Sequence, residues 1–306
     1  MKSRDDMREA GPKWHATGLN NALIFSATYN GVTHFPRALS YGIGHVGTWI
    51  AYRMMRGGTD ALRDNLRVVR PDVSDRELNR LALLTYRTYA KDVIDFIRNV
   101  EATKTSLEPL IAELDSGRFD ELLALKRGVL AVGGHFGNWE LGGIALRVLR
   151  EVPVTVIGRP EASPVVGQIR KKMRDSLGIE TLEIGHTMDT ALKIRGVLGQ
   201  NGIVAMLLDR HLGRDRVDVT MFGRTTGFLR TPAMIALLAG TPMLPCFLER
   251  REDDRFVGLC GDPIWVDASL PPEQAVQRAT QAFATQLEAR IALRPHLWYQ
   301  FYRYWE

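Results

Sequence analysis

The chain has 306 residues, of which 45% are hydrophobic and 25% are charged, a composition typical of a folded globular protein and not of a disordered one. Its formal net charge of +5 favours an anionic partner, such as a lipid headgroup, an acidic carrier protein or nucleic acid. The two cysteines, Cys246 and Cys260, stand in no metal-binding spacing, so we expect neither a metal site nor a disulfide framework.

The N-terminal region predicts helices that contact a membrane. Residues 1–15 mix acidic and basic side chains and lack the apolar core of a secretory signal, which favours the cytoplasmic side. Residues 17–55 carry only Arg37 and Arg53 as charges, but Asn, Gly and Pro36 interrupt them, so the roughly 20 apolar residues of a spanning helix are not clearly reached. An interfacial or core helical hairpin is the favoured interpretation, and a single transmembrane anchor is the alternative.

Further helices are predicted up to residue 118. Ser74 with Glu77 three residues later is a capping-box start, and apolar residues then recur at helical spacing as far as Ile97. Pro71 ends the helix before it. We therefore expect residues 1–118 to form a helical N-terminal portion that packs on the core and contacts the membrane.

From residue 119 onwards, strand-like and helix-like segments alternate. Apolar runs typical of strands occupy 128–132, 152–158, 181–185, 202–209 and 242–250, and 255–266 predicts an edge hairpin or two short strands. Helical patterns occupy 119–127, 164–178, 191–200, 231–240 and, at greater length, 272–293. This alternation predicts an α/β catalytic domain at 119–306, with a central mixed, largely parallel sheet flanked by helices.

The stretch GGHFGNWE (133–140) places a histidine after a strand and a glutamate at the start of the next helix. Open α/β sheets bind ligands at this edge. His135 can deprotonate a hydroxyl near neutral pH, and Glu140, within reach of its other ring nitrogen, would fix the tautomer and stabilise the imidazolium. From the residues alone, a buried structural histidine and a first-turn acid favoured by the helix dipole remain the alternative.

The longer stretch GGHFGNWELGG (133–143) resembles the signature of the bacterial lipid A late acyltransferases and the related mycobacterial phosphatidylinositol mannoside acyltransferases. In that family a His, four spacers and an acidic residue form the catalytic pair, which here is His135 and Glu140. The similarity covers roughly residues 60–306 and includes GRP (158–160), Asp209-Arg210, MFGR (221–224), Thr226, the helix from Pro232, TPMLPCFLER (241–250) and the aromatic end RPHLWYQFYRYWE (294–306).

The resemblance implies acyl transfer from acyl-CoA or acyl carrier protein to a hydroxyl of a lipid or glycolipid, with no further cofactor and no acyl-enzyme. The absence of a Gly-x-Ser-x-Gly nucleophile elbow agrees with direct transfer. A lipid ester or thioester hydrolase, in which the same base activates water, and a non-catalytic lipid-binding protein on the same fold are the alternatives. We expect the protein at the cytoplasmic side of the inner membrane, peripheral or held by one N-terminal anchor. No nucleic-acid-binding signature accompanies the charge.

Further candidates for substrate binding follow strands or precede helices. Arg159 and Arg210 would hold phosphates of donor or acceptor. Asp209 would orient Arg159 or a main-chain amide, or cap a turn. Two more arginines flank the turn-like 225–227 ahead of a helix N-terminus, where anions bind well. The full predicted set is Arg159, Asp209, Arg210, Arg224, Arg230 and Asn138.

Three other features have two interpretations each. The basic run Lys171, Lys172 and Arg174 would meet anionic lipid or carrier protein, or form a solvated helix face. The C-terminal aromatics 298–305 would anchor at a membrane interface or pack under the sheet. Thr231 stands where the family often has a glycine, so substrate contacts there are expected to differ.

Overall fold

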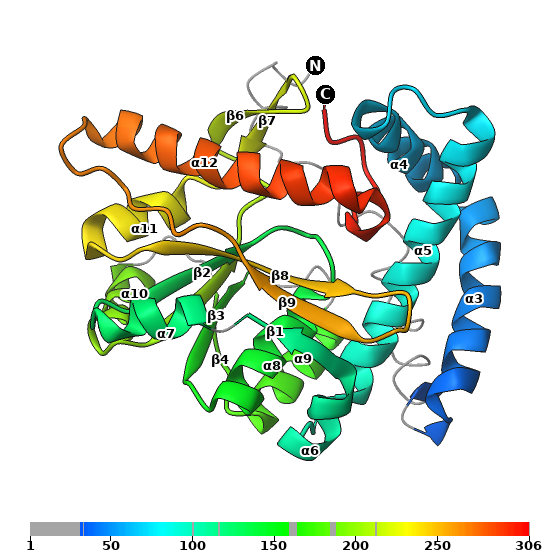
Figure 1. The fold of residues 1–306 in the computed structure, drawn as a ribbon, viewed down its shortest axis with the longest axis horizontal. Coiled ribbons are helices and arrows are strands. Elements are labelled where there is room, and N and C mark those ends of the chain that lie inside the picture. The colour runs from blue at the N-terminus through cyan, green and yellow to red at the C-terminus, as the bar shows by residue number, and fades with distance from the viewer. Residues whose placement is uncertain are drawn as a thin grey trace.

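The computed structural model describes residues 31–32, 34–99, 101–115, 117–158, 164–183, 188–211 and 213–305. Arg159 and residues 17–30, the first part of the predicted segment 17–55, lie outside this range. Within it, Figure 1 shows a central sheet with helices on both faces and the helices α3, α4 and α5 along one side.

The central sheet has seven strands in the order β1-β9-β8-β2-β5-β3-β4. Neighbouring strands are parallel except for β8 and β9, which confirms the predicted mixed, largely parallel sheet. The segment 255–266 is not at an edge, because β1 pairs with the outer side of β9. The strands are β1 (Ile111–Leu114), β2 (Val129–Gly133), β3 (Val154–Gly158), β4 (Glu180–Glu183), β5 (Ile203–Leu207), β8 (Met243–Arg250) and β9 (Phe256–Cys260).

Helices cover both faces of the sheet, so β2 is apolar along its whole length, as is usual for a buried parallel strand. Leu130 and Val132 face a core that α10, α11 and α12 complete, whereas Val129 and Ala131 face α7 and α8. The predicted long helix 272–293 is α12, with the expected bounds. The covering helices are α7 (Gly117–Ala124), α8 (Trp139–Arg150), α9 (Pro164–Ser176), α10 (Met188–Gly199), α11 (Thr231–Ala239) and α12 (Pro272–Leu293).

The N-terminal helices begin and end where their capping and breaking residues predict. The Ser74 hydroxyl accepts a hydrogen bond from the Glu77 amide at 3.3 Å at the start of α5, and α4 ends shortly before Pro71. The edge strand β1 precedes residue 119, so the sheet takes one strand from the segment 1–118, and the proposed division at 118 stays a prediction. The helices are α3 (Arg37–Met54), α4 (Arg56–Val69), α5 (Asp75–Arg98), α6 (Lys104–Leu107) and the 3₁₀ turn η3 (Glu108–Leu110).

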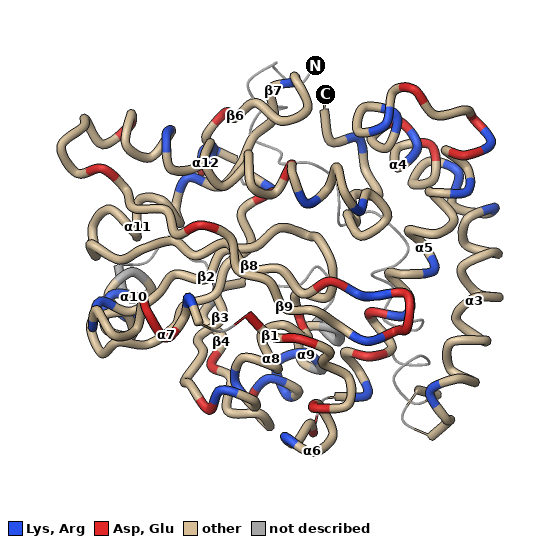
Figure 2. Tube along the Cα trace, viewed as in Figure 1, with Lys and Arg blue, Asp and Glu red and all other residues tan. Residues whose placement is uncertain are grey.

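One face of α3 is apolar and exposed to solvent. Figure 2 shows few charges along this helix. Arg37 at its start pairs with Asp95, and Arg53 near its end stacks on Trp49. In the part of the chain that the structure describes, no helix combines the length and apolarity needed to cross a bilayer. The exposed apolar side chains on α3 and just before it are Phe35, Leu39, Ile43, Val46, Trp49, Ile50 and Met54.

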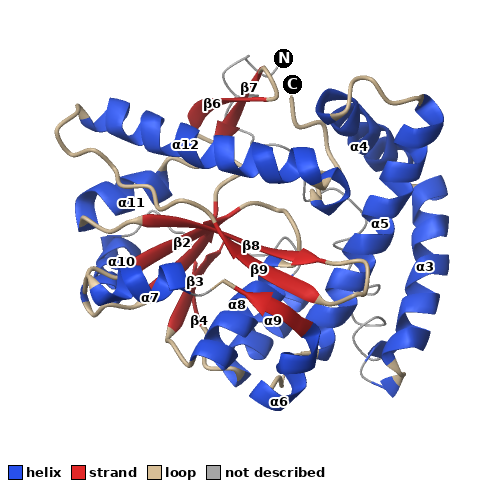
Figure 3. Ribbon diagram, viewed as in Figure 1, coloured by secondary structure: helices blue, strands red, loops and turns tan. Residues whose placement is uncertain are grey.

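A hairpin lies beside α12 where the sequence suggested a turn (Figure 3). Strands β6 (Val217–Met221) and β7 (Arg224–Phe228) are antiparallel and are joined by Phe222 and Gly223, both with positive φ, as a tight two-residue turn requires. The interpretation of 225–227 as a turn is therefore wrong, because these residues belong to β7.

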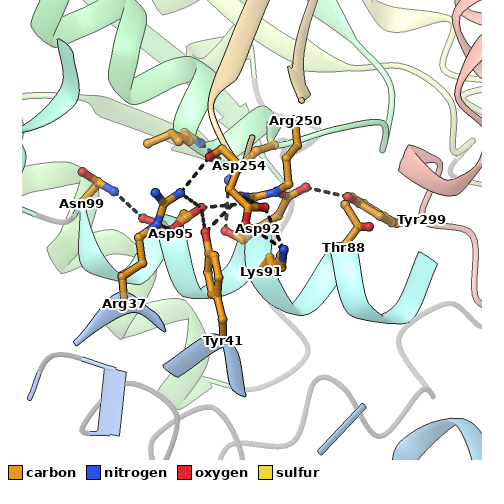
Figure 4. Close-up of polar contacts among 12 residues, drawn as sticks. Arg37, Tyr41, Thr88, Lys91, Asp92, Asp95, Asn99, Arg250, Asp254 and Tyr299 are labelled. Carbon is orange, nitrogen blue, oxygen red and sulfur yellow. Dashed lines mark hydrogen bonds and ion pairs between the residues drawn. The ribbon is translucent and has the colours of Figure 1, made fainter. Parts of the chain in front are cut away.

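A buried ionic cluster fastens α3 and α5 to the β8–β9 hairpin (Figure 4). Arg250, at the end of β8, donates to Asp92 and to Asp95 at 2.7 Å each, and Arg37 on α3 donates to Asp95 at 2.9 Å. All three members from α5 and β8 are almost fully buried. Tyr299 extends the cluster, because its hydroxyl donates to Asp92 at 2.5 Å.

Candidate active site

The loop between β2 and α8 holds His135 in a fixed backbone position. The Tyr299 amide donates to the His135 carbonyl at 2.9 Å. Two residues later, Gly137 has a φ of +64°, and a Cβ there would lie 2.2 Å from the Leu248 carbonyl oxygen, so only glycine fits. Asn138 then caps α8 by accepting from the Leu141 amide at 3.1 Å. The loop is thus fixed at both its ends.

Asp209 is the hydrogen-bonding partner of the His135 ring. The two residues follow neighbouring parallel strands, β2 and β5, whose last residues Gly133 and Leu207 lie opposite each other. His135 Nδ1 lies 2.6 Å from Asp209 Oδ1, and the His135 amide donates to Asp209 Oδ2 at 2.9 Å. Asp209 is 0% exposed, whereas the His135 side chain is 18% exposed. Of the alternatives predicted for Asp209, the contact with a main-chain amide is present, and the amide is that of His135.

The charges around the pair keep Asp209 ionised and His135 neutral. Burial would raise the pKa of Asp209, but the His135 ring and Arg210 outweigh it and hold that pKa below its usual value. Burial lowers the pKa of His135, Arg210 lowers it further, and Asp209 opposes both only in part. An ionised Asp209 can only accept, so Nδ1 carries the proton and Nε2 presents a lone pair.

Glu140 does not form the expected hydrogen bond to His135. The Nδ1 atom of the ring is bonded to Asp209, and Glu140 instead accepts from Arg174 at 2.9 and 3.0 Å and from Arg170 at 3.2 Å, both on α9. Burial would raise the pKa of Glu140, but Arg174 and Arg170 outweigh it, and the pKa lies below its usual value. The first turn of α8 thus presents an ionised carboxylate that holds two arginines beside the site.

A large apolar cavity of about 1140 Å³ opens onto His135. This volume lies just above the usual range for small-molecule sites, about 300 to 1,000 Å³. Small residues of the sheet, including Ala131, Ala205 and Cys246, are among those that line the cavity, as are Gly142 and Gly143 on α8. Polar residues gather where His135 lines it, namely Glu140, Arg170, Arg174, Arg210 and Tyr302. The arrangement can take a long apolar group with a polar end near an imidazole.

Comparison with known proteins decides the family. The family model for bacterial lipid A biosynthesis acyltransferases matches residues 12–306. The chain belongs to this family. The resemblance predicted from the His-Glu stretch is therefore confirmed, and the match extends further toward the N-terminus than residue 60.

Curated relatives of this acyltransferase family member come from mycobacteria. The phosphatidylinositol mannoside acyltransferase of Mycolicibacterium smegmatis is 27% identical over 294 residues, which cover 92% of this chain and 90% of that protein. The protein of the same name from Mycobacterium tuberculosis is 28% identical over 266 residues, covering 84% of this chain and 80% of the relative. The family and the names of these relatives support acyltransferase activity on a lipid or glycolipid.

The other predicted residues of this acyltransferase family member lie at varying places. Arg210 lines the cavity and donates to the Gln300 side chain at 3.0 Å. Arg224 is exposed at the start of β7, and Arg230 pairs with Glu273 on α12. Neither arginine is among the described residues that line the cavity. Asn138 is buried and bonded through both ends of its amide, so its part in substrate binding stays a prediction.

Several residues of the site were not singled out by the sequence. Arg170 directly precedes the basic run Lys171, Lys172 and Arg174, and it forms an ion pair with Glu140. Within the run, Arg174 also pairs with Glu140, whereas Lys171 pairs with Asp175 on the surface. A spacing of four residues on a helix that follows a strand could have indicated that both arginines share one face. Gln300 gave no signal, since a lone amide in an aromatic segment has no characteristic pattern.

Proposed function

We propose that the protein transfers a fatty acyl group from a thioester donor, acyl-CoA or acyl carrier protein, to a hydroxyl of a lipid or glycolipid. One observation supports this most strongly. The His135 ring is hydrogen-bonded through Nδ1 to the buried Asp209 carboxylate, and it lines a large, mainly apolar cavity together with several polar residues. Acyl transfer needs a base beside a site for a fatty chain, and this arrangement supports both requirements.

In the proposed reaction, His135 Nε2 takes the proton of the acceptor hydroxyl as its oxygen attacks the thioester carbonyl. The C–O bond forms, the C–S bond breaks, and the proton passes from the imidazolium to the leaving thiolate. Asp209 stabilises the imidazolium because its carboxylate is already hydrogen-bonded to Nδ1. No acyl-enzyme is formed, and no further cofactor takes part.

Glu140 contributes through the arginines that it holds and through its charge near His135. Its carboxylate fixes Arg170 and Arg174 at the polar end of the cavity. Guanidinium groups suit phosphates of a donor nucleotide, a phosphopantetheine arm or a lipid headgroup. The relatives named phosphatidylinositol mannoside acyltransferases make a phosphorylated glycolipid the favoured acceptor. Arg159, Arg210, Arg224, Arg230 and Asn138 stay proposed substrate contacts.

We also propose that the protein lies on the cytoplasmic face of the membrane through α3. The exposed apolar face of this helix is typical of an interfacial helix. Such a placement would bring lipid substrates to the cavity, because α3 residues Ile43, Ile50 and Met54 also line it.

The proposed function is tested by following loss of the acyl thioester with and without an acceptor. Purified protein is incubated with palmitoyl-CoA or palmitoyl carrier protein, and with vesicles that do or do not contain phosphatidylinositol mannoside or a lipid A precursor. Acceptor-dependent product supports the transferase. Turnover without acceptor would instead identify a hydrolase.

The catalytic role of His135 is tested in the same assay. His135→Ala should lower product formation on the order of 10²-fold to 10⁴-fold, as loss of a general base does. A folded His135→Ala protein that makes product at the normal rate would leave a non-catalytic lipid-binding role, with the activity due to a contaminant.

A further inference from the structure

The C-terminal segment after α12 crosses directly over the His135–Asp209 pair and places Gln300 against it. Gln300 is 0% exposed, and its Nε2 donates to Asp209 Oδ2 at 2.7 Å. Its Oε1 accepts from Arg210 Nε at 3.0 Å. Its main-chain carbonyl accepts from Asn65 on α4 at 3.0 Å. The side chain is therefore held at both ends of its amide, and the main chain of the same residue is held by α4.

Only one orientation of the Gln300 amide satisfies both neighbours. The amine faces a carboxylate, which can only accept, and the carbonyl faces a guanidinium, which can only donate. A flipped amide would set oxygen against Asp209 and hydrogen against Arg210. Gln thus offers Asp209 a donor and Arg210 an acceptor without adding a charge, and Asn has the same amide on a side chain that is one methylene shorter.

The Gln300 amide affects the His135 ring through the hydrogen bonds of Asp209. In the described part of the chain, the carboxylate accepts from the His135 ring, the His135 amide and Gln300, and Tyr304 holds its main-chain carbonyl at 2.9 Å. Arg210 stands next to Asp209 but donates to Gln300 and to the Tyr299 carbonyl. Without Gln300, the guanidinium could turn to the carboxylate and compete with the ring for it.

We propose that Gln300 is a positioning residue for acyl transfer, which holds the Asp209 carboxylate on the His135 ring and keeps Arg210 away from that carboxylate. The inference rests on the proposed function, because it concerns the rate of the same reaction. Gln300 acts through Asp209 and does not touch the substrate in this role.

Two substitutions separate the two contacts of Gln300. Gln300→Met keeps the volume and removes both side-chain hydrogen bonds, including the one that holds Arg210 Nε away from Asp209. Gln300→Glu keeps the acceptor for Arg210 but replaces the donor to Asp209 with a second negative charge. Gln286→Met is the matched control, since Gln286 on α12 also makes two hydrogen bonds, to the main chain of Asp262, away from the His135–Asp209 pair.

The pH profile distinguishes positioning from a merely structural role. With Arg210 closer, the protonated ring is disfavoured, and the acidic limb of kcat in Gln300→Met should move to lower pH. The added carboxylate in Gln300→Glu favours the protonated ring and should move that limb to higher pH. The charged or titratable groups that face the pair are Arg170 on α9, Glu140 on α8, Arg210 after β5, and Tyr302 and Tyr304 of the C-terminal segment. Neither substitution replaces any of these residues.

The measurement is steady-state transfer from acyl-CoA at several pH values, with folding checked by circular dichroism. Gln300→Met should lose about tenfold to 100-fold in kcat, with KM for acyl-CoA changed less than about threefold, as for residues that orient a catalytic group. The inference would be overturned if kcat of Gln300→Met lay within twofold of that of Gln286→Met. It would also be overturned if the acidic limbs of Gln300→Met and Gln300→Glu did not move apart. If Gln300→Met does not fold, the inference is tested by Gln300→Glu alone: its acidic limb of kcat should lie at higher pH than that of the wild-type protein. Wild-type protein without acceptor-dependent transfer would reject the proposed function itself, which is a separate result.

Discussion

At the scale of single residues, the site contains two carboxylates in different environments. Asp209 is bonded to the His135 ring and amide, whereas Glu140 is bonded to two arginines. Pairs of acids with separate surroundings commonly have separate roles in catalysis. Asp209 is suited to orient and stabilise the imidazolium, and Glu140 is suited to hold cations beside it.

The carboxylate that serves His135 can be identified by isosteric amides. Asp209→Asn keeps the shape but presents a donor or a neutral acceptor to Nδ1, so kcat should fall on the order of 10²-fold to 10⁴-fold. Glu140→Gln releases Arg170 and Arg174 from an ionic partner, and it should raise KM for the phosphorylated substrate more than Asp209→Asn does. Steady-state kinetics of both folded variants give the answer. An unchanged kcat in Asp209→Asn would contradict the assignment.

The pH dependence of the wild-type protein follows from the pKa of His135. Burial and Arg210 hold this pKa below its usual value, so the base form persists to lower pH than for an unperturbed histidine, and the proposed reaction needs this neutral ring. The acidic limb of kcat/KM should therefore lie below about pH 6.5. Rates measured from about pH 4.5 to 8, with a check that the protein stays folded, would show this. A limb above pH 7 is incompatible with the geometry.

The position of His135 after a strand could be predicted from the sequence, but the partner of its ring could not. A glycine pair after an apolar run indicates a strand end, whereas the role of His135 as a base stays a prediction from the family resemblance. The contact with Asp209 depends on β2 and β5 being neighbours, although β3 and β4 lie between them in the chain. Local periodicity gives no strand order, and the contact was therefore out of reach.

At the scale of elements, α3 has two unlike faces. The face toward α5 is fixed by the Arg250 cluster, and the other presents apolar side chains to solvent. The low charge of this segment could be predicted, because the sequence has no acidic residue, lysine or arginine between Arg37 and Arg53. It could not show which side chains would be covered.

Membrane binding through α3 is tested by a charge on its exposed face. Ile43 is 53% exposed, and Ile43→Glu should lower binding to anionic vesicles, since a charge at the interface opposes insertion of the apolar face. Leu238→Glu is the control, because Leu238 is 76% exposed on α11, on the opposite side of the molecule in Figure 1. Flotation with vesicles measures both. Equal binding of the two variants would count against the α3 surface.

The Arg250 cluster makes a prediction on stability. Arg250→Met leaves Asp92 and Asp95 buried without their shared cation, and loss of one partner of a buried ion pair costs about 3 to 5 kcal/mol. Lys171→Met breaks an exposed pair with Asp175 and should cost less than about 1 kcal/mol. Denaturant unfolding of both variants gives the two free energies. A loss in Arg250→Met no larger than in Lys171→Met would show that the cluster adds little.

At the scale of the whole molecule, the cavity is lined by residues of the sheet, of α3, α5 and α8, and of the C-terminal segment. The alternation of strands and helices predicted the α/β class and the bounds of α12. It missed the β6–β7 hairpin, whose short alternating segment VDVTM precedes a turn without the usual Asn-Gly signal. It also missed β1, which is four residues long. The cavity could not be predicted, because residues of separate segments line one cavity only after the chain has folded.

The cavity can be shortened at Gly143. A Cβ at this position meets no atom within 4 Å, and the residue lies within α8 and lines the cavity. Gly143→Leu should therefore keep the fold and shift transfer toward shorter acyl chains, because the side chain occupies part of the space. Gly196→Leu on α10 also meets open space but does not line the cavity, and it should not change chain preference. Competition between acyl-CoA chain lengths measures the shift, and an unchanged preference would argue that the acyl chain binds elsewhere.

The His135–Asp209 pair has a consequence for the order in which activity arises during folding. His135, Asp209 and Gln300 are brought together from loops and a C-terminal segment that lie far apart in the chain. Contacts of such long sequence separation form slowly, because the loops that join them must be closed first. Under the proposed function, a partly folded chain therefore lacks an oriented imidazole, and transfer activity should appear only after these three segments have come together.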